Sequence, residues 1–212
     1  MAVPVRMCGL VLAAGAGTRF GGPKALARTA DGTPWVSRAM RMLRDAGCAD
    51  VIVALGASAP EASLLVPDDA RIVVVSSWHE GLGATLRAGL GAVGAGAGAD
   101  GDEADGWDAV LVTPVDTPDA TPEAAVRVAE RGVAPVSPGA VRARLSARAA
   151  LARATYAGAP GHPVLIGRDH WRALAGSLAG DSGAGRYLSA HAALDVECGD
   201  LWSGADIDRR PN

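Results

Sequence analysis

The stretch VRMCGLVLAAGAGTRFGGPK, residues 5–24, decides the fold. Its first part, Val5–Ala13, is an almost uninterrupted apolar run, which is typical of a β-strand buried on both faces of a sheet. The run stops at Gly15 and Gly17, and glycines allow backbone N–H groups to face an anion without a Cβ in the way. Arg19 and Lys24 lie in the same loop and add cationic donors. The stretch therefore predicts a strand followed by a polyphosphate-binding loop.

The loop differs from two common phosphate-binding motifs. No Gly-Lys-Ser/Thr opens a helix after it, as a P-loop requires, and Phe20 stands where a dinucleotide fingerprint has its third glycine. The next predicted helix starts only at Trp35, and so long a connection in a compact α/β unit is usually functional or disordered. A glycine turn with two solvated cations is the structural alternative.

Outward from this stretch, strands and helices alternate along the chain. Short buried apolar runs predict strands at 51–55, 71–76 and 108–112. Apolar residues at helical spacing predict helices at 35–46, 84–93 and 120–130. A strand, a helix and a second strand in this order favour a right-handed crossover onto a parallel sheet, so the fold class is α/β.

The C-terminal part of the chain is less regular. Residues 142–154 are rich in Ala and Arg and are ambiguous between helix and strand, whereas Pro163–Ile166 predicts a short strand. Two further helices and a last strand are expected at 169–175, 185–191 and 193–197. The acidic glycine run at 94–106 predicts a mobile surface loop, with a domain linker as the alternative, and we expect one domain over residues 1–212.

Composition and charge exclude several classes of protein. Hydrophobic residues make up 49% of the chain and charged residues 20%, as in soluble globular proteins. A net charge of −3 lacks the basic excess that nucleic-acid binding uses. No apolar run approaches the roughly 18 residues of a membrane-spanning helix and no signal-peptide pattern is seen, so we expect a cytoplasmic protein without a membrane partner. Cys8, Cys48 and Cys198 have no paired spacing and are expected to be buried, reduced thiols.

Asp116 is a candidate metal ligand. It follows the strand predicted at 108–112 and lies among prolines, which fix the backbone so that the carboxylate projects from a rigid edge. Magnesium bound to phosphates takes one or two carboxylates and completes its shell with water. A cap or turn carboxylate is the alternative. The sequence shows no Ser/His/Asp or Cys/His set that would support a covalent intermediate, so positioning and charge neutralisation are the expected sources of catalysis.

His162 is the only histidine flanked by a glycine and a proline. This placement presents the ring at a loop rather than packing it on an apolar face. We therefore expect His162, together with Gly161, in the pocket that binds the acceptor of the reaction.

From Leu12 to Lys24 the chain reads Leu-Ala-Ala-Gly-x-Gly-x-Arg-Phe-Gly-x-x-Lys. In this motif it resembles the MobA-like NTP transferases, the nucleotidyltransferases of molybdenum-cofactor biosynthesis and their sugar- and isoprenoid-nucleotidylating relatives. The segments Trp78–Gly89, Gly161–Gly167 and Gly180–Arg186 are most similar to the molybdopterin cytidylyltransferase branch.

The resemblance implies a fold, a reaction and a set of site residues. The fold is a Rossmann-like, mostly parallel mixed sheet with helices on both faces, of the nucleotide-diphospho-sugar transferase type. The reaction moves a nucleoside monophosphate from an NTP, with CTP favoured, to a phosphorylated small-molecule acceptor of the molybdopterin type, requires Mg²⁺ and releases pyrophosphate. The implied catalytic residues are Arg19, Lys24 and Asp116, and the implied nucleotide-binding residues are Leu12, Ala13, Ala14, Gly15, Gly17, Arg19, Lys24, Gly83, Ala84 and Thr85.

Asp206 and Asp208 resemble the second acidic element of the family, which makes Asp206 a metal ligand beside Asp116. The match to that element ends after Asp208, and a solvated acid is the alternative for Asp206. Taken alone, Thr85 could equally be a helix N-cap, and Asp181 fits a cap for a helix near Gly183.

Three rival functions stay open at this point. The chain could transfer a nucleotide to a sugar phosphate or an isoprenoid precursor, act as an oxidoreductase, or bind nucleotides without catalysis. A partner protein that receives the finished cofactor is a further expectation.

Overall fold

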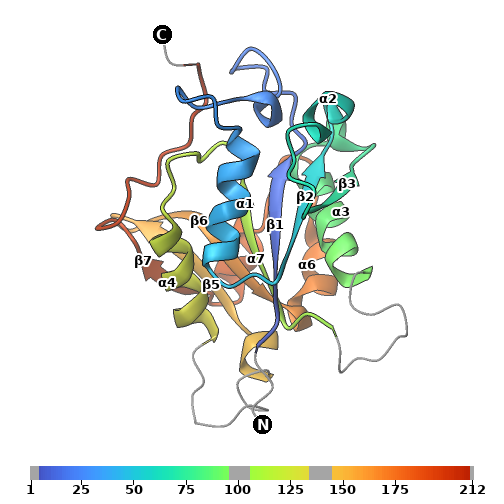
Figure 1. Cartoon of the computed structure of the whole chain (residues 1–212). Helices are drawn as coiled ribbons and strands as arrows, with labels where there is room; N and C mark the ends of the chain where they lie inside the picture. The colour runs from blue at the N-terminus through green and yellow to red at the C-terminus, as the bar shows by residue number, and fades with distance from the viewer. Residues whose placement is uncertain (1–4, 96–105, 134–144, 211–212) are drawn as a thin grey trace.

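The computed structural model describes residues 5–95, 106–133 and 145–210, which form one mixed sheet of seven strands with helices on both faces (Figure 1). The strand order is β3-β2-β1-β4-β6-β5-β7. Strand β6 runs antiparallel to its neighbours β4 and β5, and the other strand pairs are parallel. The strands are β1 Met7–Ala13, β2 Asp50–Leu55, β3 Arg71–Val74, β4 Ala109–Pro114, β5 Leu151–Tyr156, β6 Ala159–Gly167 and β7 Leu194–Glu197. The predicted α/β class with a mostly parallel mixed sheet is confirmed.

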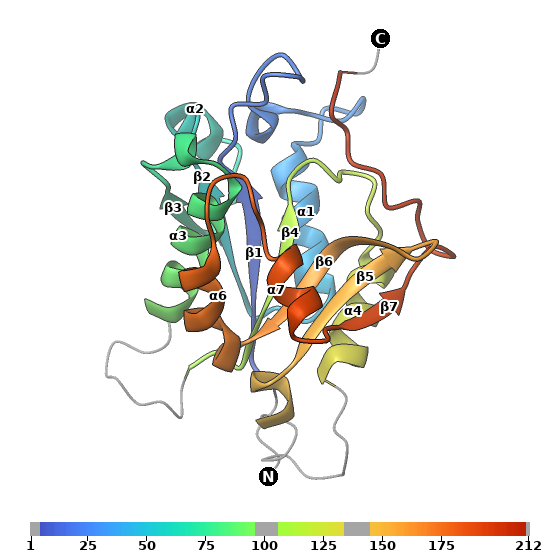
Figure 2. The same cartoon turned by 180° about the vertical axis from the view of Figure 1, so that it is seen from behind.

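Strand β1 is buried along its whole length, as its apolar run predicts. Its side chains alternate between two cores, so that Val11 and Ala13 pack on one face of the sheet and Leu10 and Leu12 on the other. Helices α1 (Trp35–Asp45) and α4 (Pro122–Val133) cover the first face, and α2 (Ala59–Ser63) joins them at its edge (Figure 1). Helices α3 (Leu82–Ala95), α6 (Trp171–Ser177) and α7 (Gly185–Ala190) cover the second face (Figure 2).

Several boundaries differ from the sequence expectations. The ambiguous segment 142–154 contains both kinds of structure, since residues 145–148 are helical and β5 begins at Leu151. The strand expected at Pro163–Ile166 is longer and pairs with β5 as a hairpin. Helix α2 and the short 3-10 helices η1 (Lys24–Leu26) and η2 (Trp78–Glu80) were not predicted. The helix expected at 169–175 is divided into the 3-10 helix η4 (Arg168–His170) and helix α6.

The loop predicted at 94–106 lies almost wholly outside the described residues. Gly94 and Ala95 belong to helix α3 instead. The three cysteines are free and buried, as predicted, and burial raises the pKa of both Cys8 and Cys48 to about 12. None of the helices in the described part of the chain is long and apolar enough to cross a membrane.

The topology brings the loop after β1 and the C-terminal segment to the same end of the sheet. From β1 the chain proceeds to β2 and β3 on one side and then returns to pair β4 with the other side of β1. Ligands of open α/β sheets bind at such a reversal, outside the carboxyl ends of the strands. The loop that follows β1 and the C-terminal segment both lie at this end of the molecule (Figure 1). The order of the strands therefore places a ligand crevice beside the glycine loop.

Candidate nucleotide and metal site

The glycine loop closes on itself after β1. The N–H groups of Phe20 and Gly22 donate to the carbonyl oxygen of Gly17 at 2.9 and 3.1 Å. Gly17 has φ +60°, and a Cβ there would collide with the carbonyl oxygen of Gly22. Gly17 is therefore required by the loop itself, because a side chain would meet both strain and a clash.

Gly15 has a different reason to be glycine. A Cβ at this position would meet no protein atom within 4 Å, and the residue is exposed to the cleft beside the loop. The fold alone leaves room for a side chain at Gly15. A ligand that approaches the backbone closely is the remaining physical reason for a glycine here.

The cleft has a volume of about 530 Å³ and runs from the glycine loop to the start of α3. Of the predicted nucleotide-binding residues, those that line it are Leu12, Ala13, Ala14, Gly15, Gly17, Lys24 and Thr85. The other three predicted residues do not line the cleft. Gly83 and Ala84 are buried, and the side chain of Arg19 is 73% exposed. Thr85 lies in the first turn of α3, which begins at Leu82, so the N-cap alternative for Thr85 is wrong. Trp78, His79 and Asp181 also line the cleft and were not predicted to do so.

A second hollow of about 780 Å³ adjoins the loop through Gly22, Pro23 and Ile207. Phe20 and Trp35 form part of its wall. Asp116, Asp206, Asp208 and Lys24 are not among the residues that line it. The smaller cleft, which contains Lys24 and Asp116, is therefore the candidate nucleotide site.

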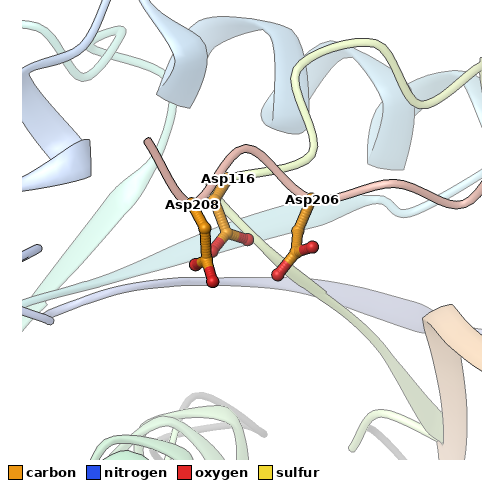
Figure 3. A group of neighbouring side chains, drawn as sticks. All are labelled: Asp116, Asp206 and Asp208. Atoms are coloured by element: carbon orange, nitrogen blue, oxygen red, sulfur yellow. The ribbon is translucent and has the colours of Figure 1, made fainter. Parts of the chain in front are cut away.

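Three carboxylates meet at the edge of the cleft (Figure 3). One oxygen each from Asp116, Asp206 and Asp208 lies within 4.8 Å of the other two. Asp116 follows β4, and its carbonyl oxygen accepts a 2.9 Å hydrogen bond from the N–H of Ile207. Ile207 packs against the core while the acids on either side of it face Asp116. Hard carboxylate oxygens at this spacing fit a small divalent cation such as Mg²⁺ or Mn²⁺.

Lys24 joins the glycine loop to this acidic cluster. Its Nζ donates to Asp116 Oδ2 at 2.9 Å and to Asp208 Oδ1 at 3.0 Å, and its side chain is only 13% exposed. Burial lowers the pKa of Lys24, but the hydrogen bonds and charges of the two acids outweigh burial and raise that pKa above its ordinary value. The hydrogen bond from Lys24 lowers the pKa of Asp208. Arg19 pairs with Asp208 at 2.8 Å. The predicted catalytic residues Arg19, Lys24 and Asp116 are thus brought together, and Asp208 joins them.

His162 lies on β6, next to the acidic cluster. Burial lowers its pKa, and the nearby charges of Asp116 and Asp206 oppose that effect. The hydroxyl of Tyr156 donates to the carbonyl oxygen of His162 at 2.7 Å. Gly161 has a packing reason to be glycine, because a Cβ there would collide with the ring of Tyr156. His162 does not line the 530 Å³ cleft, so it approaches the acidic cluster from outside that cleft.

We expect Gly15→Ala and Gly17→Ala to have opposite effects. Gly15→Ala should keep the native melting temperature and weaken the binding of Mg²⁺·CTP about tenfold, which corresponds to about 1.4 kcal/mol. Gly17→Ala should lower the melting temperature, since a residue forced into a left-handed conformation costs about 1–3 kcal/mol. Thermal melting and calorimetric titration of both variants test this. Native nucleotide affinity in Gly15→Ala would contradict a close approach of the ligand at Gly15.

Comparison with known proteins identifies a family and several similar proteins. Residues 9–195 match the MobA-like NTP transferase domain. Nicotine blue oxidoreductase from Paenarthrobacter nicotinovorans is 31% identical over 208 residues, which is 94% of this chain and 91% of the relative. Rv0371c from Mycobacterium tuberculosis H37Rv has a TM-score of 0.75 at 23% identity, over 98% of this chain and 94% of the other. A further structure of Rv0371C is a complex with manganese. Its TM-score is 0.65 at 23% identity, over 92% of this chain and 88% of the other.

A nucleotidyl transferase from Methanothermobacter thermautotroptrophicus has a TM-score of 0.66 at 20% identity, over 96% of this chain and 92% of the other. The solved structures show that the chain shares its single-domain α/β fold with these proteins.

Proposed function

Since the chain belongs to the family of MobA-like NTP transferase domains, we propose that it transfers a nucleoside monophosphate from an NTP to a phosphorylated small-molecule acceptor and releases pyrophosphate. One observation carries this proposal. Lys24 of the glycine loop contacts Asp116 and Asp208, which together with Asp206 form a candidate metal site at the edge of a nucleotide-sized cleft. Positive charge and metal ligands are what phosphoryl and nucleotidyl transfer require of a protein.

Each site residue has a separate proposed role in an in-line displacement at the α-phosphorus. The acceptor phosphate is already ionised at neutral pH, so its oxygen can attack the α-phosphorus without a general base. Lys24 and Arg19 neutralise charge on the phosphates as pyrophosphate departs. Asp116, Asp206 and Asp208 would hold the divalent cation, which would supply positive charge to offset the negative charge that develops on the phosphates. His162 borders the acidic cluster, and we propose that His162 and its neighbour Gly161 contact the acceptor.

We propose Mg²⁺ as the metal, CTP as the favoured nucleotide and a molybdopterin-type phosphate as the acceptor. Three oxygen ligands favour Mg²⁺ chemistry, and the manganese complex of Rv0371C supports a divalent ion in this fold. A sugar phosphate or an isoprenoid phosphate is the alternative acceptor. A cytoplasmic location and a partner protein that receives the product stay predictions.

A screen of the four NTPs with Mg²⁺ tests the proposal. Pyrophosphate release is measured with and without molybdopterin, sugar-phosphate and isoprenoid-phosphate acceptors. We expect release to depend on both Mg²⁺ and one acceptor, and to be fastest with CTP. Tight NTP binding without release under any of these conditions would favour a non-catalytic nucleotide-binding module.

An oxidoreductase is the second candidate, because the relative that is 31% identical is named nicotine blue oxidoreductase. Such an enzyme would need a reductant such as NADPH in place of an NTP and would have no use for the acidic cluster. Oxidation of NADPH at 340 nm in the presence of a quinonoid dye, unaffected by chelation of divalent metals, would support this candidate. Pyrophosphate release without any oxidation of NADPH would exclude the oxidoreductase candidate.

A further inference from the structure

The cleft contains a carboxylate that does not belong to the acidic cluster. Asp181 lies in the loop between α6 and α7 and lines the cleft beside Gly81, Leu82 and Thr85 at the start of α3. Its side chain is exposed to this space. Metal binding and phosphate neutralisation, as described above, do not use it.

The loop that carries Asp181 is fastened to α3. The N–H of Gly83 donates to the carbonyl oxygen of Gly180 at 2.9 Å. Arg87 of α3 donates to the carbonyl oxygens of Ala175 and Leu178 at the other end of the loop. Gly81 has φ +103°, and a Cβ there would lie 2.5 Å from Oδ1 of Asp181. Glycine at position 81 therefore keeps the space in which the carboxylate of Asp181 sits.

The contacts of Asp181 within the described part of the chain do not explain why its loop is held against α3. Over the ranges 5–95, 106–133 and 145–210, no hydrogen bond or ion pair involves its carboxylate. The expectation that it caps a helix is not met, because α7 begins at Gly185 after Ala184 without a side-chain cap. A carboxylate without a partner, held at a fixed place in a ligand cleft, is available to the ligand.

The chemistry of a carboxylate restricts which groups of a ligand Asp181 can contact. Both oxygens accept hydrogen bonds and donate none, and their charge repels phosphates. In the proposed function the phosphates lie at Lys24 and the acidic cluster, which leaves the ribose and the base for the wall formed by Gly81 and Asp181, and of these two parts only the base differs between NTPs.

We infer that Asp181 reads the nucleobase and selects a base that presents an amino donor at its edge; this inference rests on the proposed function. The 4-amino group of cytosine, or the N1–H and 2-amino group of guanine, can donate to the carboxylate. Uracil and xanthine present a carbonyl oxygen at the corresponding position, which repels it. Asp181 therefore discriminates CTP from UTP, or GTP from XTP, by one substituent.

Calorimetric titration without an acceptor tests the inference. Mg²⁺·CTP, Mg²⁺·UTP, Mg²⁺·GTP and Mg²⁺·XTP are titrated into the native chain, Asp181→Asn and Glu80→Gln. The native chain should bind the amino member of at least one pair about tenfold or more tightly, as expected for a hydrogen bond to a charged group. Asp181→Asn should abolish or reverse that ratio, because its amide can donate to a carbonyl. Glu80→Gln, an exposed acid beside Gly81 that does not line the cleft, should keep the native ratio.

Two further results separate the ways in which this inference can fail. An equal ratio in the native chain and Asp181→Asn, with NTP binding intact, overturns the base-reading role alone. Mg²⁺·dCTP is titrated as a fifth nucleotide, and an effect of Asp181→Asn confined to the ratio of CTP to dCTP also overturns the inference, since the carboxylate would then contact the ribose. Failure of the native chain to bind these nucleotides and ATP overturns the proposed function itself.

Discussion

Asp116→Asn is expected to lower Mg²⁺-dependent turnover at least about a hundredfold, because a metal that neutralises transition-state charge contributes several kcal/mol. The substitution keeps the shape of the side chain and removes the charge that a divalent cation needs. Without ligand, the melting temperature should change little. Asp116 loses an ion pair with Lys24, but repulsion from Asp206 and Asp208 is relieved and Lys24 keeps Asp208 as a partner. Pyrophosphate release across a Mg²⁺ titration and melting without nucleotide are the two measurements.

Asp119→Asn is the matched control for this variant. Asp119 is an exposed acid three positions along the same loop and lies outside the acidic cluster. Its replacement should leave turnover at the native level. Asp116→Asn with near-native turnover at saturating Mg²⁺ and a lowered melting temperature would mean that Asp116 is an architectural carboxylate.

Lys24→Ala is expected to change two affinities in opposite directions. The affinity for Mg²⁺·CTP should fall about tenfold to a hundredfold, as expected when a charge-assisted hydrogen bond to phosphate is lost. The affinity for Mn²⁺ without nucleotide should rise, because Lys24 competes with a cation for Asp116 and Asp208. Calorimetry measures the first affinity, and the electron paramagnetic resonance signal of free Mn²⁺ measures the second.

Arg41→Ala serves as the control, since Arg41 is an exposed cation on α1 away from the cleft. Arg19→Ala should weaken nucleotide binding less than Lys24→Ala, because the Arg19 side chain is 73% exposed and that of Lys24 is 13% exposed. Unchanged nucleotide affinity in both Lys24→Ala and Arg19→Ala would contradict a phosphate-binding role for the loop.

The sequence predicts the first half of the fold well because strands β1, β2 and β4 are buried on both faces, whereas β3, which was expected to be buried, is a mostly exposed edge strand. Val51–Leu55 lies inside β2, and the run that ends at Ala13 is β1, with the glycine loop directly after it. Residues 142–154 could not be assigned because alanine and arginine carry little periodic hydrophobic signal. Strand β5 forms because it pairs with β6 and β7. This pairing depends on the tertiary structure, so the local sequence does not reveal it.

The candidate site was predictable in part. Asp116 stands out because it follows a buried strand at the ligand edge of a parallel sheet. The participation of Asp208 depends on a contact with Lys24 across 184 positions, and no local pattern reveals it. The sequence Asp-Ile-Asp at 206–208 holds a weak signal, since an extended segment directs both acids away from its apolar residue. The place of Asp181 in the cleft likewise results from the packing of its loop on α3.

Label balance with CTP tests the central claim most directly. The native chain is incubated with Mg²⁺ and a phosphorylated acceptor, in parallel with CTP labelled at the α-phosphate and CTP labelled at the γ-phosphate. Nucleotidyl transfer predicts that the α label enters the acceptor product and the γ label enters pyrophosphate, in equal amounts. Release of the γ label as inorganic phosphate, or no movement of either label with every acceptor tested, would contradict it.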